Sequence, residues 1–177
     1  MNSASFALVT EPATLALGAA LARSAPRRGS AALSVFLQGE LGSGKTTLAR
    51  ALLRELGVTG TVRSPTYTLI ENYPLSDWQV LHLDLYRLRD ASELEHLGLR
   101  DELRAGVLAL IEWPERAPQG LPIPDLRIQL SAGEAGDPAL GTDTRRVNIN
   151  AETEAGRKWL SDLNAVYAPR NERNKQL

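Results

Sequence analysis

A glycine-rich stretch constrains the fold of this chain more than any other feature of its sequence. It fits the pattern G-x-x-x-x-G-K-[ST] throughout and consists of Gly39, Glu40, Leu41, Gly42, Ser43, Gly44, Lys45 and Thr46. Glycines let the backbone turn so that successive N–H groups and the N-terminus of the next helix hold phosphate oxygens. In such loops the lysine reaches the β- and γ-phosphates, and the following hydroxyl ligates Mg²⁺. The pattern therefore predicts a P-loop for a nucleoside triphosphate with Mg²⁺.

The segments on either side of this stretch are those that a P-loop requires. Residues 32–37 form an apolar run of strand length, and residues 45–56 are expected to form a helix that Gly57 closes. The plain structural alternative is a glycine-rich turn before an amphipathic helix. The buried strand in front of the loop favours the P-loop over that alternative.

Strands that alternate with helices indicate a single α/β domain. We expect strands at residues 5–9, 32–37, 67–73, 79–83, 107–111, 126–130 and 146–150, and helices at 10–24, 45–56, 90–98 and 152–166. Thr10 caps the first helix, which tolerates Pro12 in its first turn. The short connection at residues 74–77 indicates a hairpin, so the sheet is mixed. The continuous apolar runs indicate strands covered on both faces. The prediction is a three-layer P-loop NTPase domain with a mixed, mainly parallel central sheet.

The length of 177 residues corresponds to one ordinary domain, which we assign to residues 1–168. Residues 169–177 read as a polar, frayed C-terminal tail, and residues 131–144 as a surface excursion within the domain. The hydrophobic fraction of 43% and the charged fraction of 23% are typical of a soluble globular protein.

Charge and composition exclude several classes of function. Twenty basic and 21 acidic residues leave a formal charge of −1, without the basic excess that free nucleic-acid binding requires. The absence of Cys excludes disulfides and thiolate metal sites. The N-terminus lacks the pattern of a signal peptide, and no stretch approaches the roughly 18 apolar residues of a membrane span. We expect a cytoplasmic protein with no membrane partner.

Two acidic residues follow apolar strands and are candidates for holding Mg²⁺ or its water. Asp84 ends the strand at residues 79–83, and Glu112 ends the strand at residues 107–111. Ligands bind at the carboxyl edge of such sheets, where both side chains can project. The alternative for each is a surface acid at a strand end.

Other polar residues near these acids have more than one interpretation. In the segment Ser64-Pro65-Thr66-Tyr67, Thr66 could reach the γ-phosphate or Mg²⁺ as a switch threonine does, but a plain turn is the simpler interpretation. For His82 we expect a buried, hydrogen-bonded side chain. Trp113 either covers the site or wedges a turn.

Several motifs together resemble the TsaE family, the ATPase component of the bacterial machinery that makes tRNA N6-threonylcarbamoyladenosine. They are GELGSGKTTL at 39–48, SPTYTLIENY at 64–73, HLDLYRL at 82–88, ELEHLGLRDEL at 93–103 and IEWPE at 111–115. The resemblance spans about residues 12–130 and implies ATP, Mg²⁺ and weak ATPase activity. It also implies two partners, the transferase subunit of the pathway and its dimerising paralogue. The resemblance implies that the chain contacts tRNA only indirectly, through the complex. It further implies that the chain resets or activates the transferase and does not itself transfer the carbamoyl group.

The resemblance also assigns roles to residues of this sequence. Lys45 corresponds to the P-loop lysine, Thr46 to the Mg²⁺ ligand and Thr66 to the switch-like threonine. Asp84 and Glu112 correspond to the aspartate of HxDxYR and the glutamate before Trp, both near Mg²⁺. The nucleotide-binding set also includes Thr14, near where the base would lie, and Thr47. A basic residue near the C-terminus is expected to touch the nucleotide, but the sequence does not separate Arg145 from Arg146.

The expected reaction is ATP hydrolysis by positioning and charge stabilisation, without a covalent intermediate. Lys45 and the loop hold phosphates, Asp84 helps to hold Mg²⁺, and Glu112 orients or deprotonates the attacking water. Three alternatives stay open. A small-molecule kinase would need a lid with several Arg residues, which are here spread through residues 87–104. A GTPase would need an NKxD element, which is absent, and a nucleotide-dependent binding module would need no catalysis.

Overall fold

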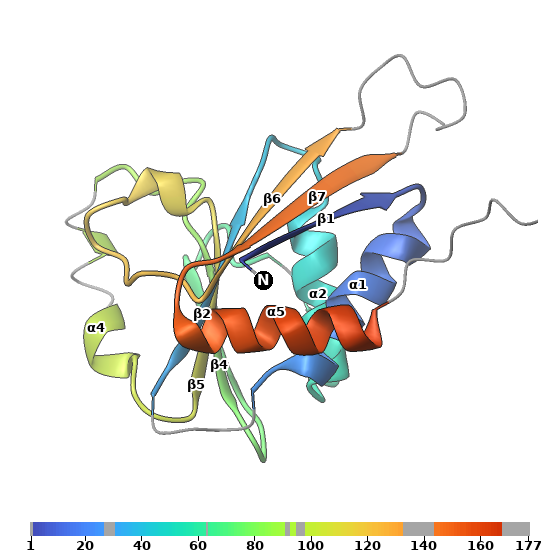
Figure 1. Ribbon diagram of the computed structural model, residues 1–177. Helices are drawn as coiled ribbons and strands as arrows, with labels where there is room; N and C mark the ends of the chain where they lie inside the picture. The colour runs from blue at the N-terminus through green and yellow to red at the C-terminus, as the bar shows by residue number, and fades with distance from the viewer. Residues whose placement is uncertain are drawn as a thin grey trace, which may run out of the picture.

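The computed structural model describes residues 2–26, 31–62, 64–90, 93–94, 98–132 and 144–167. Within these ranges seven strands form one sheet, in the order β1-β7-β6-β2-β5-β4-β3 (Figure 1). The strands are β1 (Ser3–Leu8), β2 (Leu33–Gln38), β3 (Ile70–Pro74), β4 (Gln79–Asp84), β5 (Val107–Glu112), β6 (Leu126–Ala132) and β7 (Arg145–Ala151). The central pairs β6–β2, β2–β5 and β5–β4 are parallel, and the outer pairs are antiparallel.

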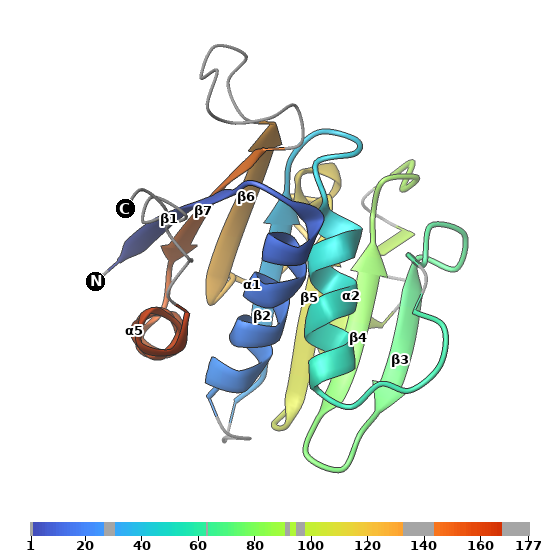
Figure 2. The same cartoon turned by 90° about the vertical axis from the view of Figure 1, so that its right-hand side faces the viewer.

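Helices and connecting segments cover both faces of this sheet. Helices α1 (Glu11–Ser24), α2 (Lys45–Glu55) and α5 (Glu154–Val166) pack on one face, where they enclose the larger hydrophobic core (Figure 2). The other face carries a smaller core beneath the short helix α4 (Leu99–Glu102) and the 3₁₀ helix η1 (Pro114–Arg116). The predicted three-layer domain with a mixed, mainly parallel sheet is therefore confirmed. No helix in the described ranges has the length and apolar character needed to cross a bilayer.

Threonine side chains cap the N-termini of α1 and α5, the first and last helices of the domain. As predicted, Thr10 caps α1, and its hydroxyl accepts a hydrogen bond of 3.3 Å from the N–H of Ala13. Thr153 caps α5 in the same way by accepting from the N–H of Gly156 at 3.0 Å. The sequence had placed the start of this last helix at Glu152, two residues before the first helical residue of α5. A cap residue has extended backbone, so the helix itself begins only after it.

The prediction of a strand at residues 67–73 is wrong about where the strand begins. The strand β3 starts only at Ile70, because residues 66–68 form a turn in which the N–H of Leu69 bonds to the carbonyl of Pro65 at 2.7 Å. Leu69 has a φ of 62°, a left-handed conformation that ends the turn and returns the chain to the sheet. A local hydrogen bond therefore replaces the first residues of the sheet ladder.

Three sequence expectations fall wholly or largely outside the described residues. These are the tail from Pro169, most of the excursion at 131–144, and residues 91–92 and 95–97 of the short helix expected at 90–98. Residues 93 and 94 of that expected helix are helical, and the structure also describes Gly98, near which the helix was expected to end. Gly98 has a φ of 62° and stands at the N-cap of α4, which the sequence analysis missed. Four residues are too few to produce a helical hydrophobic period.

The parallel register brings the site residues to one edge of the sheet. Leu37 of β2 is the register partner of Glu112 of β5, and Glu112 is in turn the partner of Asp84 of β4. The glycine-rich loop follows β2 at this same edge and leads directly into α2. The loop and both acids therefore lie side by side.

Helices α1 and α2 lie against each other at Gly18, and this contact can be tested. A Cβ at this position would lie 2.6 Å from Ala51 Cβ and 2.7 Å from the carbonyl oxygen of Leu48. Gly to Ala in an open helix stabilises a protein by about 0.5–1 kcal/mol. Here we expect Gly18→Ala to lower the free energy of unfolding by about 1–3 kcal/mol, because the two helices must separate. Denaturant unfolding measures the difference.

Ala16→Ser is the matched control, since Ala16 is exposed on the same helix. It should change the free energy of unfolding by no more than about 0.5 kcal/mol. A Gly18→Ala variant that is more stable than the unmodified chain would contradict the close helix contact.

Candidate functional site

The glycines of the loop hold backbone conformations that other residues rarely adopt. Gly39, Gly42 and Gly44 have φ values of 138°, 79° and 102°. At Gly39 a Cβ would also lie only 2.1 Å from the carbonyl oxygen of Leu130. The loop shape therefore depends on glycine at these positions. Gly44 stands at the N-cap of α2, so the N-terminus of that helix opens into the loop.

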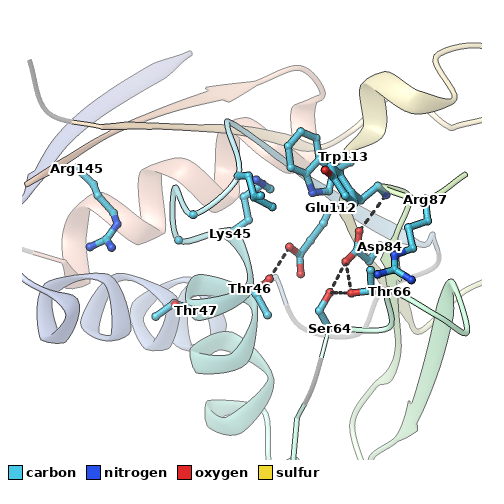
Figure 3. A pocket seen from close by; sticks show the side chains of 14 residues that line it. Lys45, Thr46, Thr47, Ser64, Thr66, Asp84, Arg87, Glu112, Trp113 and Arg145 are labelled. Atoms are coloured by element: carbon cyan, nitrogen blue, oxygen red, sulfur yellow. Dashed lines mark hydrogen bonds between the residues drawn. The ribbon is translucent and has the colours of Figure 1, made fainter. Parts of the chain in front are cut away.

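A cavity of about 400 Å³ lies in front of the loop (Figure 3). It is lined by Leu41, Gly42, Gly44, Lys45, Thr46, Thr47, Ser64, Thr66, Asp84, Tyr86, Arg87, Glu112, Trp113 and Arg145. The structure thus brings together most of the residues that the sequence singled out. Glu40 and Ser43 instead line a smaller hollow of about 150 Å³ on the same loop, together with Thr144 and Arg145. Gly39 lies behind the loop, against β6.

The Lys45 ammonium is folded back onto its own loop. Its Nζ donates hydrogen bonds to the carbonyl oxygens of Gly39 at 2.7 Å and Glu40 at 2.8 Å. It also lies 3.8 Å from the centroid of the Trp113 ring, a cation–π distance. Burial lowers the pKa of Lys45 below its usual 10.5, and the negative charge of Glu112 opposes this shift. A phosphate group entering the cavity would offer this ammonium stronger, charged acceptors.

The Glu112 carboxylate is held from two sides. The hydroxyl of Thr46 donates to Oε2 at 2.9 Å (Figure 3). On the other side, His82 Nε2 lies 2.9 Å from Oε1. Glu112 and His82 are 1% and 0% exposed, so the contact is shielded from solvent. His82 is buried and hydrogen-bonded, as the sequence analysis expected, and its partner is a predicted site residue. That pairing joins two motifs 30 residues apart, so no local sequence pattern indicates it.

Asp84 is held by the turn that precedes β3. The Thr66 hydroxyl donates to Oδ2 at 3.0 Å, Ser64 Oγ bonds to the same oxygen, and the N–H of Tyr86 donates to Oδ1 at 3.0 Å. Thr66 is therefore part of a turn, as the simpler interpretation expected, and it also lines the cavity; its contact with a γ-phosphate or Mg²⁺ stays a prediction. Ser64 lines the cavity too, and the sequence analysis assigned it no role, although it lies in the same motif.

Trp113 both covers the cavity and makes a turn. Its φ of 59° is left-handed, and it stands at the N-cap of η1 directly after β5. This backbone turn places the indole over Lys45 and 4.9 Å from the ring of Tyr86. Trp113 is therefore a cavity residue whose position in the chain also redirects the backbone.

The remaining predicted residues lie on the α1 side of the loop. Figure 3 shows Thr47 and Arg145 on the opposite side of Lys45 from Asp84. Arg145 packs on the loop, since a Cβ on Gly44 would lie 3.2 Å from its Nε. Thr14 is buried in α1, and its hydroxyl has no hydrogen-bond partner among the described residues. Arg146 is exposed and follows Arg145 on β7, so its side chain points to the other face of the sheet.

The oxygen atoms around Thr46 suit a hard divalent cation. Mg²⁺ takes oxygen ligands, typically one or two carboxylates together with waters and substrate phosphates. The Thr46 hydroxyl and the Glu112 carboxylate are adjacent, and Asp84 lies beside Glu112 in the register of the sheet. Among the described residues no group of three or more His, Cys, Asp or Glu side chains could hold a metal ion.

Comparison with known proteins decides the family. The family model described as "Threonylcarbamoyl adenosine biosynthesis protein TsaE" matches residues 8–139. The chain belongs to the TsaE family. It is 39% identical over 130 residues to the tRNA threonylcarbamoyladenosine biosynthesis protein TsaE of Haemophilus influenzae, covering 73% of this chain and 77% of the relative. It is 38% identical over 137 residues to the protein of the same name from Streptomyces coelicolor, covering 76% of this chain and 88% of that relative.

A solved structure supports the fold. The crystal structure of YdiB from Bacillus subtilis superimposes with a TM-score of 0.66 at 25% identity, covering 92% of this chain and 95% of that chain. The match extends well beyond residues 12–130, over which the sequence motifs gave the resemblance. The family and the fold are thereby established for this chain.

The contact between Lys45 and Trp113 predicts an optical signal. Addition of a nucleoside triphosphate should change the tryptophan fluorescence, because the ammonium must leave its present acceptors to meet phosphate. The chain has three Trp residues, so Trp113→Phe isolates the source. We expect this variant to lose the fluorescence change and Trp78→Phe to keep it, since Trp78 lies outside the cavity. A change that persists in Trp113→Phe would contradict the assignment.

The structure distinguishes Arg145, which lines the cavity, from Arg146, which does not, whereas the sequence did not separate the two. Arg145→Ala should weaken nucleotide binding about threefold to tenfold, since a hydrogen bond to a charged group contributes about 1.5–3 kcal/mol and part of it is exposed here. Arg146→Ala is the matched control and should leave the dissociation constant unchanged. Isothermal titration calorimetry with ATP and Mg²⁺ measures both. Equal losses in the two variants would mean that a general charge effect, and not a contact, is responsible.

Proposed function

We propose that this chain is a Mg²⁺-dependent ATP-binding protein with weak ATPase activity that supports tRNA threonylcarbamoyladenosine biosynthesis. The observation that carries the proposal is the contact of the Thr46 hydroxyl with Glu112, beside the Lys45 ammonium. The names of the curated relatives, which describe biosynthesis of this modified nucleoside in tRNA, support the biological role.

The loop and Lys45 would hold the phosphates. The backbone N–H groups of residues 39–46 and the N-terminus of α2 offer donors to anionic oxygens. Lys45 would exchange the carbonyl oxygens of Gly39 and Glu40 for β- and γ-phosphate oxygens. Thr14, Thr47 and Arg145 would form the side that meets the nucleoside, where the buried Thr14 hydroxyl still lacks a partner among the described residues.

The residues around Thr46 would hold Mg²⁺ when it is bound. Thr46 is the expected direct ligand, with Asp84 and Glu112 directly or through water. The ion would neutralise charge on the phosphates and polarise the phosphorus–oxygen bond that is cleaved.

Glu112 is the residue best placed to orient or deprotonate the attacking water. Its carboxylate lies at the floor of the cavity between Thr46 and His82. Asp84 is a weaker candidate for this role, because three donors from residues 64–66 and 86 already hold its carboxylate. ATP is proposed over GTP because the sequence lacks an NKxD element for guanine.

A partner protein would complete the site for hydrolysis, because the sequence contains no obvious arginine finger. Arg87 lines the cavity, but its guanidinium stacks 4.2 Å from the ring centroid of Tyr67, which is 85% exposed. The chain would act in the cytoplasm on the transferase subunit and its dimerising paralogue, and it would meet tRNA only through that complex. Its nucleotide cycle would reset or activate the transferase between turnovers. The transfer of the carbamoyl group itself would stay with the transferase.

Removal of the P-loop lysine tests nucleotide binding. Lys45→Ala should weaken ATP binding by at least about tenfold, because the loss of one charged hydrogen-bond donor costs about 1.5–3 kcal/mol. Calorimetry measures the dissociation constant. Lys158→Ala is the control, since Lys158 is exposed on α5 and pairs with Asp162. Unchanged affinity in Lys45→Ala would overturn the P-loop assignment.

Neutralisation of Glu112 tests hydrolysis. Glu112→Gln keeps the size of the side chain but removes the base, so the rate of phosphate release should fall roughly 100-fold or more while ATP affinity changes little. Glu115→Gln, an exposed change three residues away, should keep the rate. If Glu112→Gln loses ATP affinity instead, Glu112 is a Mg²⁺ ligand and not the group that positions water.

A further inference from the structure

A buried histidine lies beneath the proposed site and has one hydrogen-bond partner there. We propose that His82 is a positioning residue, which holds the Glu112 carboxylate in the orientation needed to act on the metal and the attacking water. This inference rests on the proposed function and adds to it a residue that does not line the cavity. According to this proposal, the hydrogen bond between His82 and Glu112 contributes to the rate of ATP hydrolysis as well as to packing.

The sheet aligns the two side chains. His82 of β4 is the register partner of Leu110 of β5, and Glu112 follows Leu110 by two residues. Side chains two residues apart on a strand share a face, so His82 and Glu112 lie on the same face of the sheet. This is the face of the larger core, which also contains Val80, Leu110 and the buried residues of α2. The histidine therefore stands between the core and the carboxylate.

The chemistry of the pair fixes the direction of the hydrogen bond. The proposed role of Glu112 requires an ionised carboxylate, which only accepts hydrogen bonds, so Nε2 of His82 would carry the proton that it shares with Oε1. The Thr46 hydroxyl occupies the other oxygen, Oε2. With one donor on each oxygen, rotation of the carboxylate would break at least one hydrogen bond in a dry environment. That arrangement limits the carboxylate to one orientation.

The hydrogen-bond inventory of the two acids shows why His82 matters to Glu112 in particular. Asp84 has three donors, so the loss of one leaves two. Glu112 has one from Thr46 and one from His82. If the Thr46 oxygen is engaged by a metal, His82 is the hydrogen-bond donor among the described residues that still holds Glu112. A buried carboxylate needs such a partner, because an unpaired one is costly.

A purely structural histidine would be expected to satisfy both ring nitrogens. Nδ1 of His82 has no hydrogen-bond partner among the described residues, although the side chain is fully buried. An orphaned buried polar atom costs about 1–3 kcal/mol, so an apolar residue would suit the core better at this end of the ring. The polar contact is made only at the end that faces the site. This asymmetry indicates that the residue serves the carboxylate.

Kinetics of two His82 variants test the proposal. His82→Leu keeps the bulk but has no donor, whereas His82→Gln places an amide N–H near the position of Nε2. We expect His82→Leu to lower kcat about 10- to 100-fold, the usual effect of removing a partner that orients a metal-site residue. The KM for ATP should change less than about threefold, since the phosphate-binding loop is untouched. The Mg²⁺ concentration for half-maximal activity should rise, and His82→Gln should recover most of kcat.

The imidazole spectrum gives a readout that needs no nucleotide. The chain has two His residues, so His96→Gln leaves only the signals of His82 for long-range ¹H–¹⁵N correlation. The proposal requires the Nε2–H tautomer, with a proton resonance that shifts when Glu112 is changed to Gln. Thermal unfolding of each variant, measured alongside, reports whether the fold is retained.

The outcomes separate this proposal from the proposed function. A His82→Leu variant with the kcat and Mg²⁺ requirement of the unmodified chain would overturn the positioning role, as would an Nδ1–H tautomer. Equal losses in His82→Leu and His82→Gln, with unfolding temperatures lowered in both, would make His82 a packing residue only. Absence of ATP binding by the unmodified chain would overturn the proposed function instead, and the tautomer would still decide whether His82 holds Glu112.

Discussion

The parallel register of three central strands is the constraint on which the rest of the site depends. It sets Leu37, Glu112 and Asp84 next to each other at the carboxyl edge of the sheet. The glycine-rich loop leaves β2 at that edge, so Thr46 at the start of α2 lies within hydrogen-bond distance of Glu112. A slip of one residue would turn these side chains to the other face. Burial of β2, β4 and β5 on both faces makes such a slip costly. The packing of the core therefore determines where the side chains of the site lie.

Several charged side chains of the cavity have partners within the protein. Lys45 bonds to carbonyl oxygens of its own loop and lies against Trp113, Glu112 accepts from Thr46, and Asp84 accepts from Thr66. A triphosphate would compete for the contacts of Lys45, and Mg²⁺ would compete for the contact between Thr46 and Glu112. Binding would therefore exchange one set of hydrogen bonds for another. The partners of Asp84 and Glu112 that do not line the cavity, such as His82, would keep the carboxylates in place during the exchange.

The fold, and most of the residues that line the cavity of the candidate site, could be predicted because their signals are local. The glycine pattern at residues 39–46, the apolar strands before Asp84 and Glu112, and the cap at Thr10 can each be read within one segment. Three features could not. The contact of His82 with Glu112 depends on strand register, the turn before Ile70 depends on a backbone hydrogen bond to Pro65, and the choice between Arg145 and Arg146 depends on which face of β7 meets the loop. The first and third are tertiary constraints that add to local preference, whereas the second is a local backbone hydrogen bond that overrides the strand propensity of the segment.

The most direct test of the central claim is formation of threonylcarbamoyladenosine on tRNA over many turnovers, by the transferase subunit and its dimerising paralogue, with and without this chain. If the nucleotide cycle at Lys45 and Glu112 resets the transferase, sustained formation requires both the chain and ATP, and Lys45→Ala abolishes the effect. Single-turnover formation should then depend on the chain less than sustained formation does. Equal sustained formation in the absence of the chain, or full activity with Lys45→Ala, would contradict the proposed role.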